Sequence, residues 1–364
     1  MRMQCALVIV LGLVACGDDG GAATPIDAGP DAACDQQSDP TCCGAIGHDC
    51  QGGACTAGVC QPVVLADPVT AADLAIADAT LYFVEPVAGT IVRLGTDGSG
   101  RAVVATTPDL PIAVAASTDA VAWATTGLQA RDGAIMRLAT GATTPTTIAT
   151  MEHAPCDLVL DATGAVWTNY GSGAVPVMPG ELRAAPAAAT PATIVPSLVH
   201  ACGLAATGSA IYYATFGTNP TDPIDGAIAT VARGGGTSLT LAANRRGARY
   251  LALTGSHVYW TEQGTTSATF QDGRVMRMSR SGGFPEVLAD DVRPRGVFAD
   301  GDAVYWLAGG AVHRLALADR AKTTVATLPG RTLTVLVGDA DALYFLVEPN
   351  PTTGAAGQLI KVAR

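Results

Sequence analysis

The sequence YLALTGSHVYWTEQG (residues 250–264) recurs in varied form along most of the chain, and this repeat decides the fold. Each copy has an apolar segment, a short turn rich in Gly, Asp or Ser, and a second apolar segment that contains aromatic residues. Apolar runs separated by such turns are typical of antiparallel β-strands. The clearest further copies are GVFADGDAVYWLAGG (296–310), GLAATGSAIYYATFG (203–217) and DLAIADATLYFVEPV (73–87).

Weaker copies lie at 112–127, 157–171 and 334–349, which brings the total to seven. The second aromatic residue of each copy serves as an anchor, and the anchors are Phe83, Trp123, Trp167, Tyr213, Trp260, Trp306 and Phe345. Neighbouring anchors are 39 to 47 residues apart, which is close to the period of β-propellers. Two more strand-like segments follow each pair, for example GRVMRM (273–278) and PEVLAD (285–290). Four strands per repeat predict the blade of a propeller.

The seventh repeat ends one strand short, at GQLIKVAR (357–364). The missing strand lies at the other end, because QPVVLADPV (61–69) matches fourth strands such as PEVLADDV (285–292). Pairing of the first strand with the last blade would close the ring and cover its edges. We therefore predict an all-β propeller of seven four-stranded blades over 61–364, or of six or eight blades if one weak copy is miscounted.

Two stretches, LYFVEPVAGTIVRLGTDGSGRAVVA (81–105) and HVYWTEQG with GRVMRMSRSGGFPEVLA (257–289), resemble the YWTD repeats of low-density-lipoprotein-receptor-type propellers and their bacterial relatives. The resemblance covers about 61–364, and it implies a propeller with an extracellular binding role. The tetrad is nearly complete only at Tyr259-Trp260-Thr261-Glu262. That family usually has six blades, so its ligand sites are not transferred to this chain.

The N-terminus reads MRMQCALVIVLGLVAC and has the short apolar run of a secretory signal. Its end, Leu13-Val14-Ala15-Cys16, resembles the lipobox of bacterial lipoproteins, in which the cysteine is acylated and becomes the mature N-terminus. An ordinary signal peptide cut nearby is the alternative. We expect a signal over 1–15, a lipid anchor at Cys16 and a flexible tether over 16–33, because the tether is rich in Gly, Pro, Ala and Asp.

A small module over 34–60 is expected to depend on disulfides, because so short a segment cannot build its own core. Its cysteines are Cys34, Cys42, Cys43, Cys50, Cys55 and Cys60. Fifteen connectivities are open, and the spacing does not choose among them. Zinc is the alternative, but export favours disulfides and no Cys-x2-Cys pair occurs. No cofactor is expected.

Segments that join the fourth strand of one repeat to the first strand of the next should gather at one mouth of the central channel. Six arginines lie there: Arg245, Arg246, Arg249, Arg293, Arg295 and Arg331. Guanidinium groups at a concave mouth suit an anionic ligand. The alternative is that Asp290, Asp291, Glu286 and backbone carbonyls neutralise these arginines, which then only tie blades together.

Cys156 and Cys202 both lie eleven residues before their anchors, so they occupy equivalent positions in neighbouring repeats. We predict a disulfide between them at the start of adjacent inner strands. His153 and His200 precede the two cysteines at offsets of three and two residues. A Cys2His2 metal site and a catalytic Cys–His pair are less favoured alternatives.

Composition and motifs narrow the function. A net charge of −11 excludes a protein whose whole surface binds nucleic acid. HExxH, GxSxG and Walker A signatures are absent from the sequence, and the first-strand starts do not supply the clustered carboxylates of a lactonase-type propeller. We expect a monomeric, non-enzymatic lipoprotein on the outer membrane or cell surface of a Gram-negative bacterium, which binds a ligand, glycan or protein partner at the channel mouth. A propeller hydrolase, lactonase or lyase and a structural assembly protein of the envelope are the alternatives.

Overall fold

The computed structural model describes residues 34–107, 109–127, 132–171, 179–186, 190–219 and 221–364. The expected signal peptide, the lipidated Cys16 and the tether therefore lie outside the described residues. Residues Asp35–Arg364 form one compact unit made of β-strands and turns. Among the residues described, no helix has the length and apolar character that crossing a bilayer requires.

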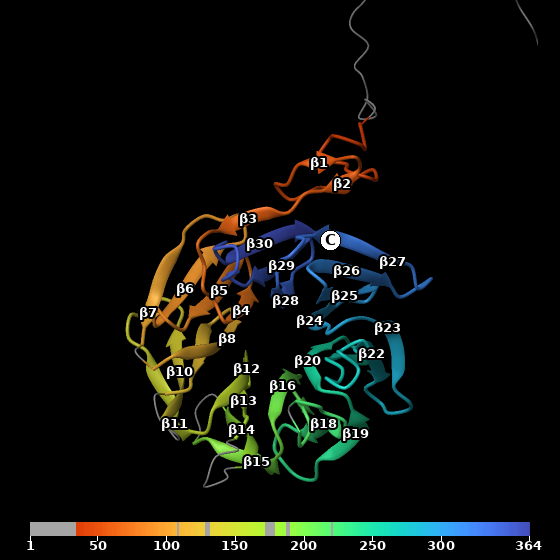
Figure 1. Ribbon diagram of the computed structural model, residues 1–364. Coiled ribbons are helices and arrows are strands. Elements are labelled where there is room, and N and C mark those ends of the chain that lie inside the picture. The colour runs from red at the N-terminus through yellow and green to blue at the C-terminus, as the bar shows by residue number, and fades with distance from the viewer. Residues whose placement is uncertain (1–33, 108, 128–131, 172–178, 187–189, 220) are drawn as a thin grey trace, which may run out of the picture. The chain divides into compact units, whose positions relative to one another are not determined.

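Seven four-stranded antiparallel sheets stand around a central axis, with the first strand of each sheet innermost (Figure 1). Blade 1 consists of β4 (Asp73–Ala77), β5 (Thr80–Glu85), β6 (Thr90–Gly95) and β7 (Ala102–Thr106). Blade 2 consists of β8 (Pro111–Ser117), β9 (Ala120–Thr125), β10 (Gly133–Ala139) and β11 (Thr146–Glu152). Blade 3 consists of β12 (Pro155–Asp161), β13 (Gly164–Asn169), β14 (Gly180–Pro186) and β15 (Ala192–Leu198). Blade 4 consists of β16 (Ala201–Ala206), β17 (Ala210–Thr215), β18 (Gly226–Ala232) and β19 (Leu239–Arg245).

The remaining blades complete the ring. Blade 5 consists of β20 (Ala248–Leu253), β21 (His257–Glu262), β22 (Arg274–Ser279) and β23 (Glu286–Asp290). Blade 6 consists of β24 (Arg295–Ala299), β25 (Ala303–Ala308), β26 (Ala311–Ala316) and β27 (Lys322–Thr327). Blade 7 consists of β28 (Leu333–Gly338), β29 (Ala342–Val347), β30 (Gln358–Ala363) and β3 (Val63–Ala66).

The ring closes as the sequence predicts. Strand β3 pairs with β30 through Val63 opposite Lys361 and Val64 opposite Ile360, so the N-terminal strand of the propeller completes its C-terminal blade. The prediction of seven four-stranded blades is confirmed. The chain therefore differs from the six blades usual in YWTD propellers, to which its repeats bear a resemblance.

The second strand of each blade carries the core. Every residue of β9, β13, β25 and β29 is buried, because each blade is covered on both faces by its neighbours. The anchors Trp167, Trp260 and Trp306 are fully buried. Clusters span two blades: Tyr259 of blade 5 packs in the same cluster as Trp306 of blade 6. The aromatic repeat of the sequence is thus the interface between blades.

Buried carboxylates also join blades, and Glu152 at the end of β11 is the clearest case. Its Oε2 accepts hydrogen bonds from Trp167 Nε1 at 2.8 Å and from Asn169 Nδ2 at 2.7 Å, and its Oε1 pairs with Arg183. Asp291 after β23 repeats the arrangement, since its Oδ2 accepts bonds from Trp306 Nε1 at 2.9 Å and from Lys322 Nζ at 3.0 Å. A carboxylate from one blade therefore satisfies the indole of the next.

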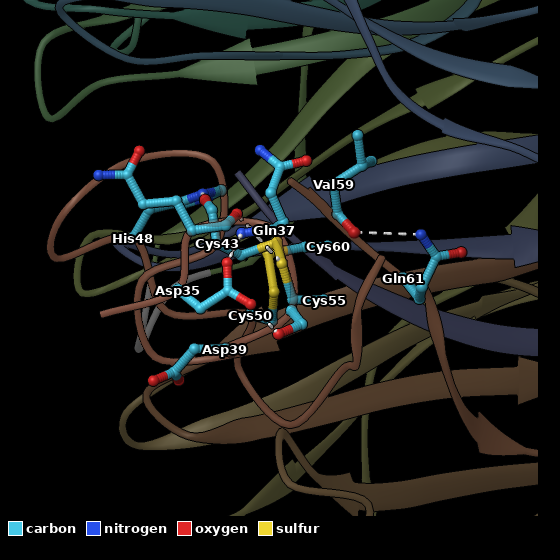
Figure 2. Close-up of a disulfide and its surroundings, with 12 residues drawn as sticks. Asp35, Gln37, Asp39, Cys43, His48, Cys50, Cys55, Val59, Cys60 and Gln61 are labelled. Carbon is cyan, nitrogen blue, oxygen red and sulfur yellow. Dashed lines mark hydrogen bonds between the residues drawn. A yellow bond between two sulfur atoms is a disulfide. The ribbon is translucent and has the colours of Figure 1, made fainter. Parts of the chain in front are cut away.

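The cysteine module is a small loop structure with one two-stranded sheet, β1 (Cys55–Thr56) and β2 (Val59–Cys60). Disulfides join Cys43 to Cys55 and Cys50 to Cys60 (Figure 2). Cys34 and Cys42 are disulfide-bonded as well. Cys43, Cys50, Cys55 and Cys60 pack in one buried cluster with Ala363, so the module adjoins β30, the strand that pairs with β3.

Candidate functional site

A cavity of about 220 Å³ lies where the inner strands begin, at one mouth of the central channel. Six of the seven inner strands have a register shift at this point, the exception being β4. Such β-bulges re-aim side chains and are frequent next to binding sites. The cavity is lined by Ala72, Asp73, Ile112, Cys156, Asp157, Cys202, Gly203, Leu204, Arg249, Tyr250, Leu251, Gly296, Val297, Val335 and Leu336.

The two cysteines of this ring form the disulfide that their equivalent positions predict. Cys156 on β12 and Cys202 on β16 are joined, with their Cα atoms 5.4 Å apart. The bond links blades 3 and 4 across 46 residues of sequence and forms part of the cavity wall. Neither cysteine therefore offers a thiolate for catalysis or for a metal.

Two carboxylates project into the same cavity from blades 1 and 3. Asp73 Oδ2 accepts a hydrogen bond from the backbone N–H of Val114 in blade 2 at 2.8 Å. Burial of the carboxylate, reinforced by the negative charge of Asp157, raises the pKa of Asp73 to about 7. Burial likewise raises the pKa of Asp157 to about 6, and the backbone N–H groups of Leu158 and Leu204 donate to its carboxylate. Both side chains thus bind the backbone of their surroundings and still face the channel.

This pair corrects the expectation that the starts of the first strands supply no clustered carboxylates. The residue eleven positions before the anchor is Ala72 in blade 1 and Cys156 in blade 3. Each aspartate is the next residue in the sequence. In blade 3 a bulge between Pro155 and Asp157 brings this second position into the cavity beside the first, whereas Asp73 reaches the cavity from β4 without a register shift. A scan of both positions around the ring would have found the pair.

Arg249 on β20 is the cation of the channel cavity. Its guanidinium stacks over the ring of Tyr250, 5.1 Å from the ring centroid. Among the residues that the structure describes, it has no ion-pair partner, although its charge lowers the pKa of both Asp73 and Asp157 against the larger effect of burial. Arg249 therefore lies close enough to both carboxylates to act on them without contacting either.

Three other arginines line a separate pocket of about 370 Å³ between blades 6 and 7, which we call the arginine pocket. They are Arg293, Arg295 and Arg331, and no acidic residue is among the residues that line this pocket. Loss of hydration and the positive charge of Arg295 lower the pKa of Arg293. Arg331 has a buried Nε without a hydrogen-bond partner in the described part of the chain. The pocket thus concentrates positive charge.

Ion pairs balance only part of the predicted basic rim. Arg295 pairs with Glu348 at 3.1 Å, and Arg331 Nη2 donates to the backbone carbonyls of Glu348 and Ala356. Arg245 pairs with Glu262 at 3.4 Å and Arg246 with Asp272 at 2.9 Å. The six arginines therefore do not converge on one site. Arg245 and Arg246 are paired and line neither pocket, one arginine lines the channel, and three line the arginine pocket, where Arg295 is also paired.

The acidic residues expected to neutralise the rim pair with other cations. Asp290 pairs with Arg274, Asp291 with Lys322, and Glu286 with Arg277 and Arg320. The neutralising partners of the rim are instead Glu262, the last residue of β21, and Asp272 and Glu348, which lie in loops after second strands. Sequence proximity therefore misidentified these partners, because the contacts cross from one blade to the next.

His200 contacts the backbone and an aromatic ring of its surroundings. Its Nδ1 lies 2.7 Å from the carbonyl oxygen of Gly217, and its ring stacks on Tyr170 at a centroid distance of 4.6 Å. The groups with metal-ligand spacing among the described residues are Cys43, Cys50 and Cys60, and Cys34, Asp39 and Cys42. All of these cysteines are in disulfides, so they offer no thiolate to a metal.

The fold and these pockets define a seven-bladed β-propeller with polar sites at one mouth of its channel. No family model and no curated protein matches the sequence. Similar solved structures include hydrazine synthase of Kuenenia stuttgartiensis, with 12% identity, 81% of this chain and 96% of that chain covered, and a TM-score of 0.59. A puromycin-hydrolysing peptidase of Mycobacterium tuberculosis has 14% identity, coverages of 83% and 54%, and a TM-score of 0.58.

Regucalcin of Agrobacterium tumefaciens, described as a calcium-binding protein, has 17% identity, coverages of 82% and 92%, and a TM-score of 0.50. All three identities are low, so the likeness shows the propeller fold alone. The functions of these proteins differ from one another, as expected of a fold that hosts many activities.

Proposed function

We propose that this protein is an envelope-anchored, non-enzymatic lipoprotein that binds a ligand carrying an anionic group at the mouth of its propeller. The anion binds in the arginine pocket. The observation that carries this proposal is that three arginines line one pocket whose lining contains no acidic residue.

The charge balance of the pocket supports an anion. Of its three arginines, Arg295 has a carboxylate partner, Glu348, and that side chain is half exposed. Arg293 stacks on Phe270, 4.5 Å from the ring centroid, and Arg331 retains an unpartnered Nε. Planar guanidinium groups bind carboxylate, sulfate and phosphate through paired, charge-assisted hydrogen bonds. A bound oxyanion would offset the loss of hydration and the repulsion from Arg295 that together lower the pKa of Arg293.

Three features support the proposed location in the cell envelope. The sequence resembles a lipoprotein signal up to Cys16, the cysteine module is held by disulfides, and a further disulfide joins blades 3 and 4. Disulfides persist in oxidising compartments. A lipid at Cys16 would tether the propeller to the outer membrane or cell surface, where the ligand would be a small molecule, a glycan or a protein partner. A propeller hydrolase and a structural assembly role are the alternatives.

Titration of inorganic phosphate and sulfate into the full chain by calorimetry tests the proposal. Arg293→Gln and Arg331→Gln should each weaken binding about tenfold or more, because a hydrogen bond to a charged group contributes about 1.5–3 kcal/mol. Arg101→Gln is the matched control: Arg101 lies in blade 1 and pairs with Glu85 at 3.5 Å.

The melting midpoint of each variant shows whether the fold is intact. If Arg331→Gln destabilises the protein through loss of its bonds to the carbonyls of Glu348 and Ala356, the Arg293 variant still tests the pocket. If the Arg101 variant lost as much affinity as the pocket variants, the loss would come from the change in net charge, and the proposal would be overturned. Binding that neither pocket variant weakens would overturn it as well.

A further inference from the structure

The channel cavity contains opposite charges that do not meet. Asp73, Asp157 and Arg249 all line it. None of the three forms an ion pair in the part of the chain that the structure describes. Buried or partly buried charges are normally paired, because loss of hydration is costly. Two carboxylates and one guanidinium therefore line one cavity without an ion-pair partner among the described residues.

Local structure holds the three groups apart. Asp73 accepts a hydrogen bond from Val114 N–H of blade 2. Asp157 accepts one from Leu204 N–H of blade 4. Arg249 stacks on Tyr250 in blade 5, where the backbone of Tyr250 has a φ of 37°. The three charged side chains come from blades 1, 3 and 5, and the inner strands of blades 2 and 4, which lie between them, carry no charged residue. The charged groups therefore surround the cavity and are not adjacent to one another.

We propose that the channel cavity binds a small zwitterion, with its ammonium group between Asp73 and Asp157 and its carboxylate on Arg249. Each carboxylate accepts a hydrogen bond from the ammonium, and the guanidinium donates to the ligand carboxylate. This site is separate from the arginine pocket, so the proposal stands whether or not that pocket binds an anion.

The rest of the cavity fits the chain that joins the two charges of such a ligand. Leu204, Leu251, Val297 and Leu336 contribute apolar wall, and the volume of about 220 Å³ limits the ligand to a small molecule. A short aliphatic chain between an amine and a carboxylate would contact these side chains. We therefore expect ω-amino acids of suitable length to be good probes.

Binding of the ammonium group should depend on pH. Asp73 faces Asp157 and Arg249, and Asp157 faces the same arginine, whose charge also acts on Tyr170 and Arg293. The pKa values of about 7 for Asp73 and about 6 for Asp157 mean that both carboxyl groups take up protons as the pH falls from about 8 to about 5. A protonated carboxyl cannot pair with an ammonium group, so affinity should fall over the same range and binding near neutral pH should release protons.

The test is calorimetry of the full chain with glycine, β-alanine, 4-aminobutyrate and 5-aminopentanoate. Butylamine and butyrate, which carry one charge each, serve as comparison ligands. At least one amino acid should bind about tenfold more tightly than either singly charged ligand. Titrations in buffers of different ionisation enthalpy should show the proton release.

Asp157→Asn and Arg249→Gln should each weaken binding of that amino acid about tenfold or more. Asparagine keeps an oxygen for the backbone N–H groups, so the fold should be retained. Asp119→Asn is the control, since Asp119 is exposed in another pocket. The Arg331→Gln variant should leave this binding unchanged, which separates the outcome from that of the arginine pocket. Absence of binding by all four amino acids, or equal binding of butylamine or butyrate, would overturn the zwitterion site.

Discussion

Replacement of Glu152 by alanine should lower the free energy of unfolding by about 3–5 kcal/mol, the usual cost of removing one partner from a buried ion pair. Glu152 is completely buried at the end of blade 2. Its removal leaves Trp167 Nε1, Asn169 Nδ2 and the guanidinium of Arg183 in blade 3 without their common acceptor. The contact between blades 2 and 3 would then lose its buried carboxylate, and Arg183 would keep only the longer contact of 3.9 Å with Glu181. Urea unfolding monitored by tryptophan fluorescence measures the change.

The same guanidinium provides a matched control. Glu181 lies 3.9 Å from Arg183 Nε, but its side chain is about one-third exposed. Glu181→Ala should therefore change stability by less than about 1 kcal/mol, as is typical of exposed ion pairs. Similar losses in the two variants would contradict the role assigned to the buried network.

The second large effect concerns the link between blades 3 and 4. The double variant Cys156→Ser, Cys202→Ser should lose about 4 kcal/mol of stability, because the disulfide closes a loop of 46 residues in the unfolded chain. The loss should show in urea unfolding as a lower midpoint with a similar native fluorescence spectrum. The serine side chains fill nearly the same space, so cavity formation contributes little.

Reduction supplies the control for this prediction. A reductant should destabilise the wild-type protein more than the double variant, because the variant has already lost the disulfide between blades. The two proteins share the module disulfides, so the difference between them isolates the Cys156–Cys202 bond. Equal stability of the two proteins under oxidising conditions would show that the disulfide adds nothing to the ring.

The fold was predictable because its cause is local and repeated. Aromatic anchors such as Trp260 and Trp306 recur at the blade period, and each is buried against a neighbouring blade. Ring closure was predictable because the propeller begins with one extra strand, β3, and its last repeat is one strand short. The Cys156–Cys202 bond followed from the same register, since equivalent residues of adjacent blades are neighbours in space.

Partners across blades were not predictable from the spacing of the anchors alone. Glu152 precedes Trp167 by 15 residues, and Asp291 precedes Trp306 by the same interval. An acidic residue 15 positions before a tryptophan anchor is therefore a signal for this contact. The position is not uniform, however, because Arg245 occupies it before Trp260 and the acid is Glu262.

The candidate sites show the same limit. The sequence places the arginines at one mouth, but which of them remain without an acidic partner depends on loops such as the one that carries Glu348. Asp73 and Asp157 were not predicted, because each lies one position after the residue counted from its anchor. A bulge turns Asp157 into the channel, whereas Asp73 lines it from a strand without a bulge. Side-chain direction at a bulge is set by the backbone, which the repeat pattern does not specify.

X-ray diffraction from crystals soaked in selenate would test the central claim most directly, because selenate has the charge and shape of sulfate and scatters anomalously. We predict an anomalous peak in the arginine pocket, within hydrogen-bonding distance of Arg293 and Arg331, and loss of that peak in the Arg331→Gln variant. A well-ordered crystal whose selenate peaks all lie outside this pocket would contradict it.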